Sequence, residues 1–130
     1  MADETKGDLA RERTDYAEDR TVLATERTFA GWLRTGYAGI AIGLAFNALF
    51  GRVEPGWIAK LIATAFLLIA VMIFIGAERR ASVVLDRLQA HKVQSAKVHN
   101  MRIVTIASIA ATLALIAALW LLTFKPPVAP

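Results

Sequence analysis

The chain of 130 residues contains no cysteine. This absence excludes disulfide frameworks, cysteine nucleophiles and zinc–thiolate sites, although it leaves the redox compartment undetermined. Charged side chains are also scarce in two long stretches: residues 57–77 hold only Lys60, and residues 103–124 hold none. Apolar stretches of about 20 residues are typical of helices that cross a membrane. We therefore expect that most of the chain serves to span a bilayer.

The usual patterns of enzyme chemistry are missing as well. No glycine-rich phosphate loop follows a strand, no paired carboxylates lie inside an apolar stretch, and no nucleophile has a base beside it. His91 and His99 lie eight residues apart, whereas metal ligands on a helix lie three or four apart with further ligands nearby. We therefore expect no enzyme, no catalytic residue, no metal site and no cofactor.

Apolar residues, in contrast, make up 56% of the chain. They form three blocks, residues 29–50, 57–77 and 103–124, each close to the ~20 residues that a helix needs to cross a ~30 Å hydrocarbon core. This pattern predicts an all-α membrane protein with three transmembrane helices. The whole chain, residues 1–130, forms one domain, in which the segments outside the spans are 1–28, 78–102 and 125–130.

Lysine and arginine counts predict the orientation of these spans. The segments 1–28 and 78–102 carry five and six basic residues, whereas the first loop and the tail carry one each. Because basic residues concentrate on the cytoplasmic side, we expect the N-terminus in the cytoplasm and the C-terminus outside. The first 28 residues are polar and include eight acids, which does not fit a signal peptide. The basic residues are Lys6, Arg11, Arg13, Arg20 and Arg27 in the first segment and Arg79, Arg80, Arg87, Lys92, Lys97 and Arg102 in the second.

The two loops differ in kind. The short sequence GRVEPG, Gly51 to Gly56, predicts a tight turn and a hairpin of the first two spans. The second loop lacks glycine and proline, and we expect the second helix to continue into the cytoplasm to about Ala90. A turn near His91 to Ser95 would then lead back to the third span. The alternative is a plain solvated linker.

A seven-residue repeat runs from the N-terminal segment into the first span. An Arg–Thr pair recurs at 13–14, 20–21, 27–28 and 34–35. Seven residues are nearly two helical turns, so the arginines form one stripe with ~10 Å between neighbours. The repeat predicts an N-terminal cytoplasmic helix that is continuous, or nearly so, with the first span. A small residue precedes each arginine by three positions (Ala10, Ala17, Ala24, Gly31), and an apolar row interleaves with the arginines (Leu9, Tyr16, Leu23, Ala30, Tyr37).

Three interpretations of the arginine stripe remain open. It could be an edge whose arginines extend toward lipid phosphates, a seam with a neighbouring copy, or the lining of a wide oligomeric vestibule. Arg34 lies inside the apolar block without an acid on the adjacent turns of its own helix, and buried membrane charges are costly. Arg27 and Arg34 are therefore candidates for anion binding or for salt bridges between helices. The candidate partners of Arg34 are Glu78, at the cytoplasmic end of the second span, and Glu26, from an adjacent copy.

Two further surfaces are candidates for interactions. Gly31, Thr35, Gly39 and Gly43 lie four residues apart, and such stripes of small residues let membrane helices approach closely. The basic residues Arg79, Arg80 and Arg87 would form a cytoplasmic face that could bind a partner or anionic lipid.

The sequence LATERTFAGWLRT, residues 23–35, resembles the entry to the first span in the YidH family of bacterial inner-membrane proteins. The family pattern is close to LA-N-ERT-F-LAW-LRT, and this chain departs from it at Thr25, Ala30 and Gly31. The characteristic domain covers about residues 14–90. The same domain of unknown function forms the membrane part of the vacuolar transporter chaperone complex of fungi.

The resemblance implies a three-span oligomeric protein of the bacterial inner (plasma) membrane. In the fungal complex, basic residues of the first helix line a polyphosphate channel. Carried over by position, that role would concern Arg27 and Arg34 here. The fungal complex also contains a polymerase, which is a separate soluble domain, and its activity does not carry over to this chain.

Two functions follow as hypotheses. The first is a structural or regulatory membrane subunit that contacts a partner through its basic cytoplasmic face. The second is an oligomeric, channel-like subunit that passes phosphate, polyphosphate or another anion along the first helix. The expected partners are the bilayer, further copies of the chain and an anionic ligand or lipid, and not nucleic acid.

Overall fold

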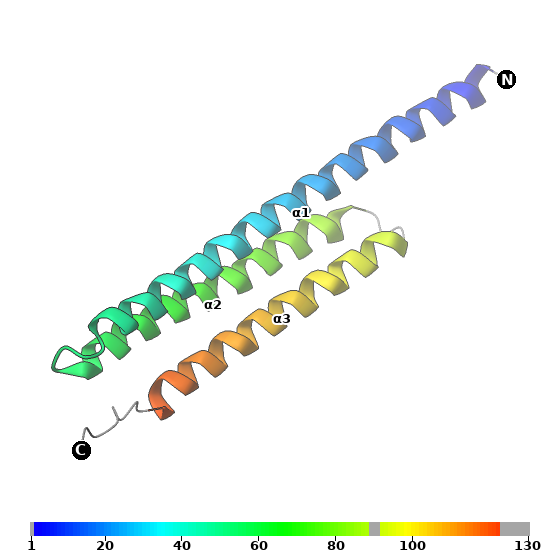
Figure 1. Cartoon of the computed structure of the whole chain (residues 1–130). Coiled ribbons are helices and arrows are strands. Elements are labelled where there is room, and N and C mark those ends of the chain that lie inside the picture. The colour runs from blue at the N-terminus through cyan, green and yellow to red at the C-terminus, as the bar shows by residue number, and fades with distance from the viewer. Residues whose placement is uncertain (1, 89–91, 123–130) are drawn as a thin grey trace.

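The chain folds into three long helices that run side by side (Figure 1). The computed structural model describes residues 2–88 and 92–122. The helices are α1, Ala2–Phe50, α2, Gly56–Arg87, and α3, Lys92–Leu121, and the described residues contain no strand. Each helix is long and apolar enough to cross a membrane, which confirms the predicted all-α class with three candidate spans. The predicted tail 125–130 and the last two residues of the predicted third span, 123 and 124, lie outside the described residues.

Helix α1 is a single element of 49 residues, about 74 Å long at 1.5 Å per residue. It contains no proline, and Asp3 and Glu4 lie in the first turn, where the helix dipole favours negative charge. The predicted N-terminal helix and the first span are therefore one helix without a break at residues 28–29. Its first part extends beyond the other two helices: among residues 2–21 only the side chain of Glu18 is even half-buried (Figure 1).

A short turn joins α1 to α2. The backbone N–H of Gly51 donates to the carbonyl of Asn47 at 2.8 Å, and that of Val53 donates to Phe50 at 3.0 Å. Pro55 has an extended backbone and directly precedes α2, a place where its missing N–H costs nothing. The predicted hairpin of the first two helices is confirmed.

The connection between α2 and α3 differs from the prediction. Helix α2 continues ten residues beyond the end of its apolar block but ends at Arg87, slightly before the predicted Ala90. Helix α3 begins at Lys92, so the predicted turn at His91 to Ser95 is wrong from residue 92 onward. Without glycine or proline in this stretch, nothing in the local sequence prevents α3 from starting early. The alternative of a plain solvated linker is also wrong, because helices occupy most of residues 78–102.

Side chains of complementary size hold α1 against α2. The buried positions of α1 recur every seven residues, at Val22, Phe29, Gly36 and Gly43. Large residues of one helix meet small residues of the other: the ring of Phe74 lies against Gly36, whereas Phe29 packs with the alanines of α2. Large side chains fitted against small ones bring helix backbones close together in an apolar medium. The buried positions of α2 are Ala59, Ala63, Leu67, Ala70, Phe74, Ala77, Ala81 and Leu85.

Polar contacts join α3 to the hairpin. The hydroxyls of Tyr37 and Ser108 lie 2.6 Å apart, and the indole N–H of Trp120 donates to the Thr64 hydroxyl at 3.0 Å. Arg102 pairs with an acid on α2 near the other end of α3. In lipid, hydrogen bonds between helices stabilise packing, because apolar side chains contact lipid acyl chains about as favourably as they contact another helix. Helix α3 is thus attached at three points along its length.

Most of the apolar surface remains uncovered. Within the most hydrophobic 18-residue window of each helix, only 11%, 28% and 17% of the residues are buried for α1, α2 and α3 respectively. A water-soluble monomer rarely exposes apolar patches of that extent. The surface fits contact with lipid or with further protein, as expected for a small membrane protein.

Candidate functional site

The arginine stripe lies on the side of α1 that faces away from α2. Arg20, Arg27 and Arg34 each precede a buried residue of α1 by two positions, which is about 200° around the helix. All three side chains are exposed, and so is that of Arg13. The apolar row that interleaves with them is exposed at Leu23, which is 59% exposed, whereas the neighbouring Val22 is 4% exposed. At the other end of this row, Tyr37 contacts Phe74 of α2 and Ser108 of α3. The stripe therefore belongs to the outer surface of one chain.

The threonines of the repeat are bonded to their own helix. The hydroxyl of Thr14 donates to the carbonyl of Ala10, and those of the three later threonines donate to the carbonyl four residues before them, at 2.9–3.1 Å. The two small members of each repeat are thus directly linked. Together these residues form a row of short side chains beside the arginines: Ala10, Thr14, Ala17, Thr21, Ala24, Thr28, Gly31 and Thr35.

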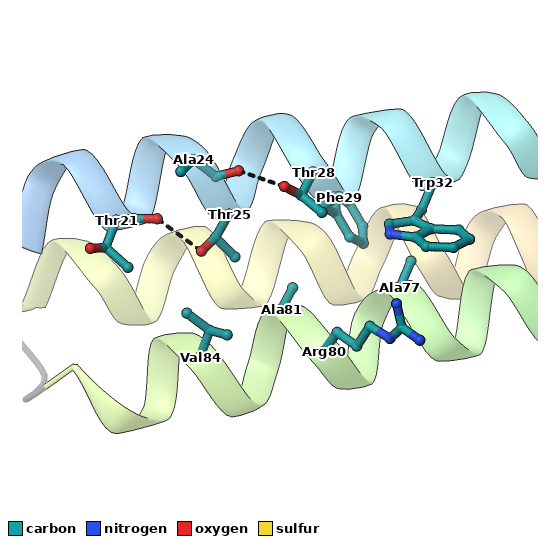
Figure 2. A pocket seen from close by; sticks show the side chains of 10 residues that line it. All are labelled: Thr21, Ala24, Thr25, Thr28, Phe29, Trp32, Ala77, Arg80, Ala81 and Val84. Carbon is teal, nitrogen blue, oxygen red and sulfur yellow. Dashed lines mark hydrogen bonds between the residues drawn. The ribbon is translucent and has the colours of Figure 1, made fainter.

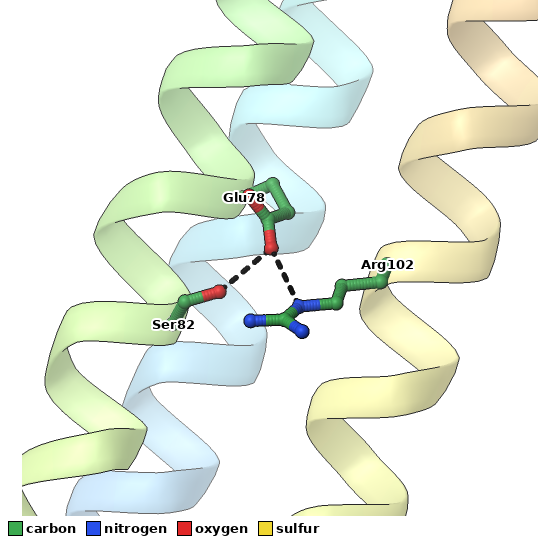
Figure 3. A network of polar contacts seen from close by, with 3 residues as sticks. All are labelled: Glu78, Ser82 and Arg102. Atoms are coloured by element: carbon green, nitrogen blue, oxygen red, sulfur yellow. Dashed lines mark hydrogen bonds and ion pairs between the residues drawn. The ribbon is translucent and has the colours of Figure 1, made fainter.

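Glu78, one predicted partner of Arg34, is engaged elsewhere in the chain. Its Oε1 accepts a hydrogen bond from Arg102 Nε at 3.1 Å and one from the Ser82 hydroxyl at 2.7 Å (Figure 3). The Glu78 side chain is 21% exposed and the Arg102 side chain 56%. Within one chain, then, Glu78 joins α2 to α3 rather than to α1. The pairing of Arg34 with Glu26 of another copy stays a prediction.

The sequence contained a signal for the pair of Glu78 and Arg102. Glu78 directly follows the apolar block of α2, and Arg102 directly precedes that of α3. Opposite charges at the same end of two antiparallel spans lie at the same depth. The sequence pattern places Arg102 in the basic segment 78–102, and only the structure identifies it as the partner of Glu78.

The predicted stripe of small residues divides into two parts. Gly43 is buried, and a Cβ added there would lie 2.9 Å from Leu67 and Phe66 and 3.1 Å from the Ala63 carbonyl. Gly39 also faces α2, with ordinary contact distances of 3.9 Å. Gly31 and Thr35, in contrast, are exposed, and nothing lies within 4 Å of a Cβ added at Gly31. Gly36, which the prediction omitted, is the other close contact with α2.

The basic residues at the end of α2 are all exposed, but one of them makes a defined contact. The guanidinium of Arg80 lies 5.1 Å from the ring centroid of Trp32 on α1, which is a cation–π geometry (Figure 2). Arg79 and Arg87 have exposed side chains. The pair of Trp32 and Arg80 was also not predicted, although Trp32 lies near the start of the first apolar block and Arg80 shortly after the end of the second.

Two cavities meet at this pair. The first has a volume of about 210 Å³ and is lined by Trp32 and Arg80 together with hydroxyl-bearing residues of α1 (Figure 2). The second, of about 340 Å³, is lined by the same pair and by apolar residues of α2 such as Met72. Among the described residues, no three His, Cys, Asp or Glu side chains gather as a metal site would require.

Comparison with family models identifies the hairpin of α1 and α2. The model of a family described as a domain of unknown function, DUF202, matches residues 20–87. That range starts within the repeat of α1 and ends at the last residue of α2, so it covers the hairpin and both cavities. No curated protein and no solved structure shows significant similarity to the chain.

Proposed function

The chain belongs to the family of the domain of unknown function DUF202, the domain found in YidH-like proteins, and from this premise we propose that it is a structural or regulatory subunit of the bacterial inner membrane rather than an enzyme. The three apolar helices fit a small membrane protein. The observation that carries the proposal is the exposed first part of α1, which extends beyond the described parts of α2 and α3.

The charges and the helix arrangement support an orientation for the chain. The first part of α1, the end of α2 and the start of α3 lie at one end of the bundle, and this end carries most of the basic residues (Figure 1). That distribution favours a cytoplasmic location for this end and an external location for the turn between α1 and α2. In this orientation α1 projects into the cytoplasm.

A projecting helix of about 20 residues needs a partner. Isolated helices of this length are marginal in water, since most helix stability in proteins comes from packing of one face. In the projecting part of α1, Ala10, Thr14 and Ala17 offer a flat surface, and Arg13 and Arg20 follow one edge of it. A second copy of α1 could approach along this row and pair its acids with these arginines. We therefore propose a homo-oligomer assembled along the outer face of α1.

Disulfide trapping tests this assembly. Because the chain has no cysteine, single cysteines can be placed at Ala17, in the row, and at Asp15, on the opposite side of the helix. We expect Ala17→Cys to form cross-linked dimers in native membranes under mild oxidation and Asp15→Cys to form several-fold fewer. Equal cross-linking of the two variants would show random collision and contradict an interface on this face.

A second candidate function rests on the exposure of Arg34. Its side chain lies within the apolar block, is exposed, and has no hydrogen bond or ion pair to another described residue. Rings of arginine contributed by several copies would attract phosphate or polyphosphate, and intramembrane charges often face a bundle interior or water. The basic end of α2 would then collect the anion at the entrance.

Anion flux separates the two functions. We expect liposomes that contain the purified chain to show no phosphate or polyphosphate flux above that of empty liposomes. Flux that is present in the wild type and lost in Arg27→Ala and Arg34→Ala would favour the channel-like subunit. The structural role predicts instead that Arg79→Ala, Arg80→Ala and Arg87→Ala together release a partner protein while membrane insertion stays intact.

A further inference from the structure

The two cavities between α1 and α2 form one groove with a polar half and an apolar half. The first cavity lies toward the projecting part of α1 and includes Thr21, Thr25 and Thr28 in its lining. The second lies toward the middle of the apolar blocks, and Ile69 and Met72 are among its lining residues. Trp32, Ala77 and Arg80 line both cavities and therefore mark the boundary between the halves.

The groove opens on a side of the hairpin that α3 does not cover. Glu78 of α2 reaches α3 through Arg102, whereas Arg80, two positions later, is about 200° away around the helix. Gly76 widens the groove, since nothing lies within 4 Å of a Cβ added there. In a bilayer, the apolar half of the groove would thus face lipid directly.

The boundary carries a positive charge that the chain leaves available. Arg80 stacks on Trp32 but makes no hydrogen bond or ion pair with a described residue. A guanidinium has five N–H donors, and a stacked one can still direct them outward in its own plane. No acidic side chain occurs among the described residues that line either cavity. The polar half therefore suits an anionic group.

We propose that this groove binds one anionic phospholipid of the cytoplasmic leaflet, with its phosphate at Arg80 and an acyl chain along Ile69, Met72 and Gly76. The proposal rests on the membrane insertion proposed above. A lipid fits better than a free phosphate for two reasons. First, a free phosphate would leave the apolar half of the groove empty, whereas an acyl chain fills it. Second, the hydroxyls of Thr21, Thr25 and Thr28 already donate to carbonyls of their own helix, so Arg80 is the main donor for an anion.

Fluorescence of Trp32 tests the proposal directly. Trp57→Phe and Trp120→Phe in the full chain leave Trp32 as the only tryptophan. This protein is placed in vesicles of unlabelled phosphatidylcholine. In one series a rising share of brominated phosphatidylglycerol is added, and in the other a rising share of brominated phosphatidylcholine. In both lipids the bromine lies near the headgroup end of the acyl chain. Quenching of Trp32 should require about fivefold less brominated phosphatidylglycerol, since one basic residue near a membrane surface contributes ~1 kcal/mol toward anionic lipid.

Matched variants locate the effect. Arg80→Gln should abolish the preference for phosphatidylglycerol, whereas Arg79→Gln, which removes the same charge from the next residue, should keep it. Gly76→Leu should reduce quenching by both lipids. Equal losses in Arg79→Gln and Arg80→Gln, or a preference that inorganic phosphate removes, would overturn the lipid site. Absence of quenching by brominated phosphatidylcholine would instead show that the chain is not inserted, which is a failure of the proposed function.

A second measurement avoids the tryptophan substitutions. Native mass spectrometry of the otherwise unaltered chain, released from membranes that contain both lipids, should show one retained phosphatidylglycerol per copy. Arg80→Gln should lose it and Arg79→Gln should retain it. Retention of the lipid by Arg80→Gln would contradict the proposal.

Discussion

Replacement of Gly43 with leucine is expected to destabilise the α1–α2 hairpin by about 3 kcal/mol, at the upper end of what overpacking of a close interface costs. Even a single Cβ at this position would lie 2.9 Å from Leu67 and Phe66. The third neighbour is the backbone carbonyl of Ala63 at 3.1 Å, which cannot move without shifting α2. The larger side chain must therefore push the two helices apart.

Distances between spin labels on cysteines at the exposed residues Leu23 and Val83 report this separation. In Gly43→Leu we expect a longer mean distance between the labels and a broader distance distribution. We also expect the variant to unfold at a lower concentration of a denaturing detergent. Gly31→Leu is the matched control, since it makes the same change on the same helix where no atom lies within 4 Å. It should leave the distance between the labels unchanged, whatever its effect on assembly. An unaltered distance in Gly43→Leu would contradict the close packing of α1 on α2.

Replacement of Glu78 with glutamine is expected to loosen one end of α3. The substitution keeps the shape of the side chain but removes the charge that receives Arg102 and Ser82. Hydrogen bonds to charged groups contribute ~1.5–3 kcal/mol, and the exposure of Arg102 reduces this to about 1 kcal/mol. Backbone amides of α3 near Arg102 should then exchange with deuterium about fivefold faster.

Asp86→Asn is the control for this loss of charge. Asp86 lies on the same helix, is exposed, and makes no hydrogen bond or ion pair with a described residue. It should leave exchange in α3 unchanged. The double variant Glu78→Arg with Arg102→Glu should restore much of the protection, because it re-creates the pair with the charges exchanged. Equal exchange rates in Glu78→Gln and the wild type would show that the pair does not hold α3.

Much of the fold could be predicted from patterns that operate along one helix. Apolar length gave the three helices, the sequence around Pro55 gave the hairpin, and the seven-residue repeat gave one continuous α1. The end of α2 was misplaced by three residues, since no glycine or proline marks it. Local signals therefore located elements well wherever breaking residues were present.

Contacts between helices were harder to predict, because periodicity alone does not say which face meets a neighbour. The repeat of α1 has an apolar row at Leu23 and another one position earlier at Val22, and only the second is buried throughout. What distinguishes it is complementarity: Gly36 accommodates Phe74, a match that requires both helices to be compared. The pair of Trp32 and Arg80 likewise depends on which residues of α1 and α2 share a level.

The orientation of the three spans is tested most directly by the accessibility of single cysteines in intact bacterial cells. The cysteines are placed at Val53, in the turn between α1 and α2, at Ala10, in the projecting part of α1, and at Val83, near the end of α2. A membrane-impermeant maleimide should label Val53→Cys in intact cells, and Ala10→Cys and Val83→Cys only after the membrane is permeabilised. Labelling of Ala10→Cys in intact cells, or of Val53→Cys only after permeabilisation, would contradict an inserted hairpin with a cytoplasmic α1.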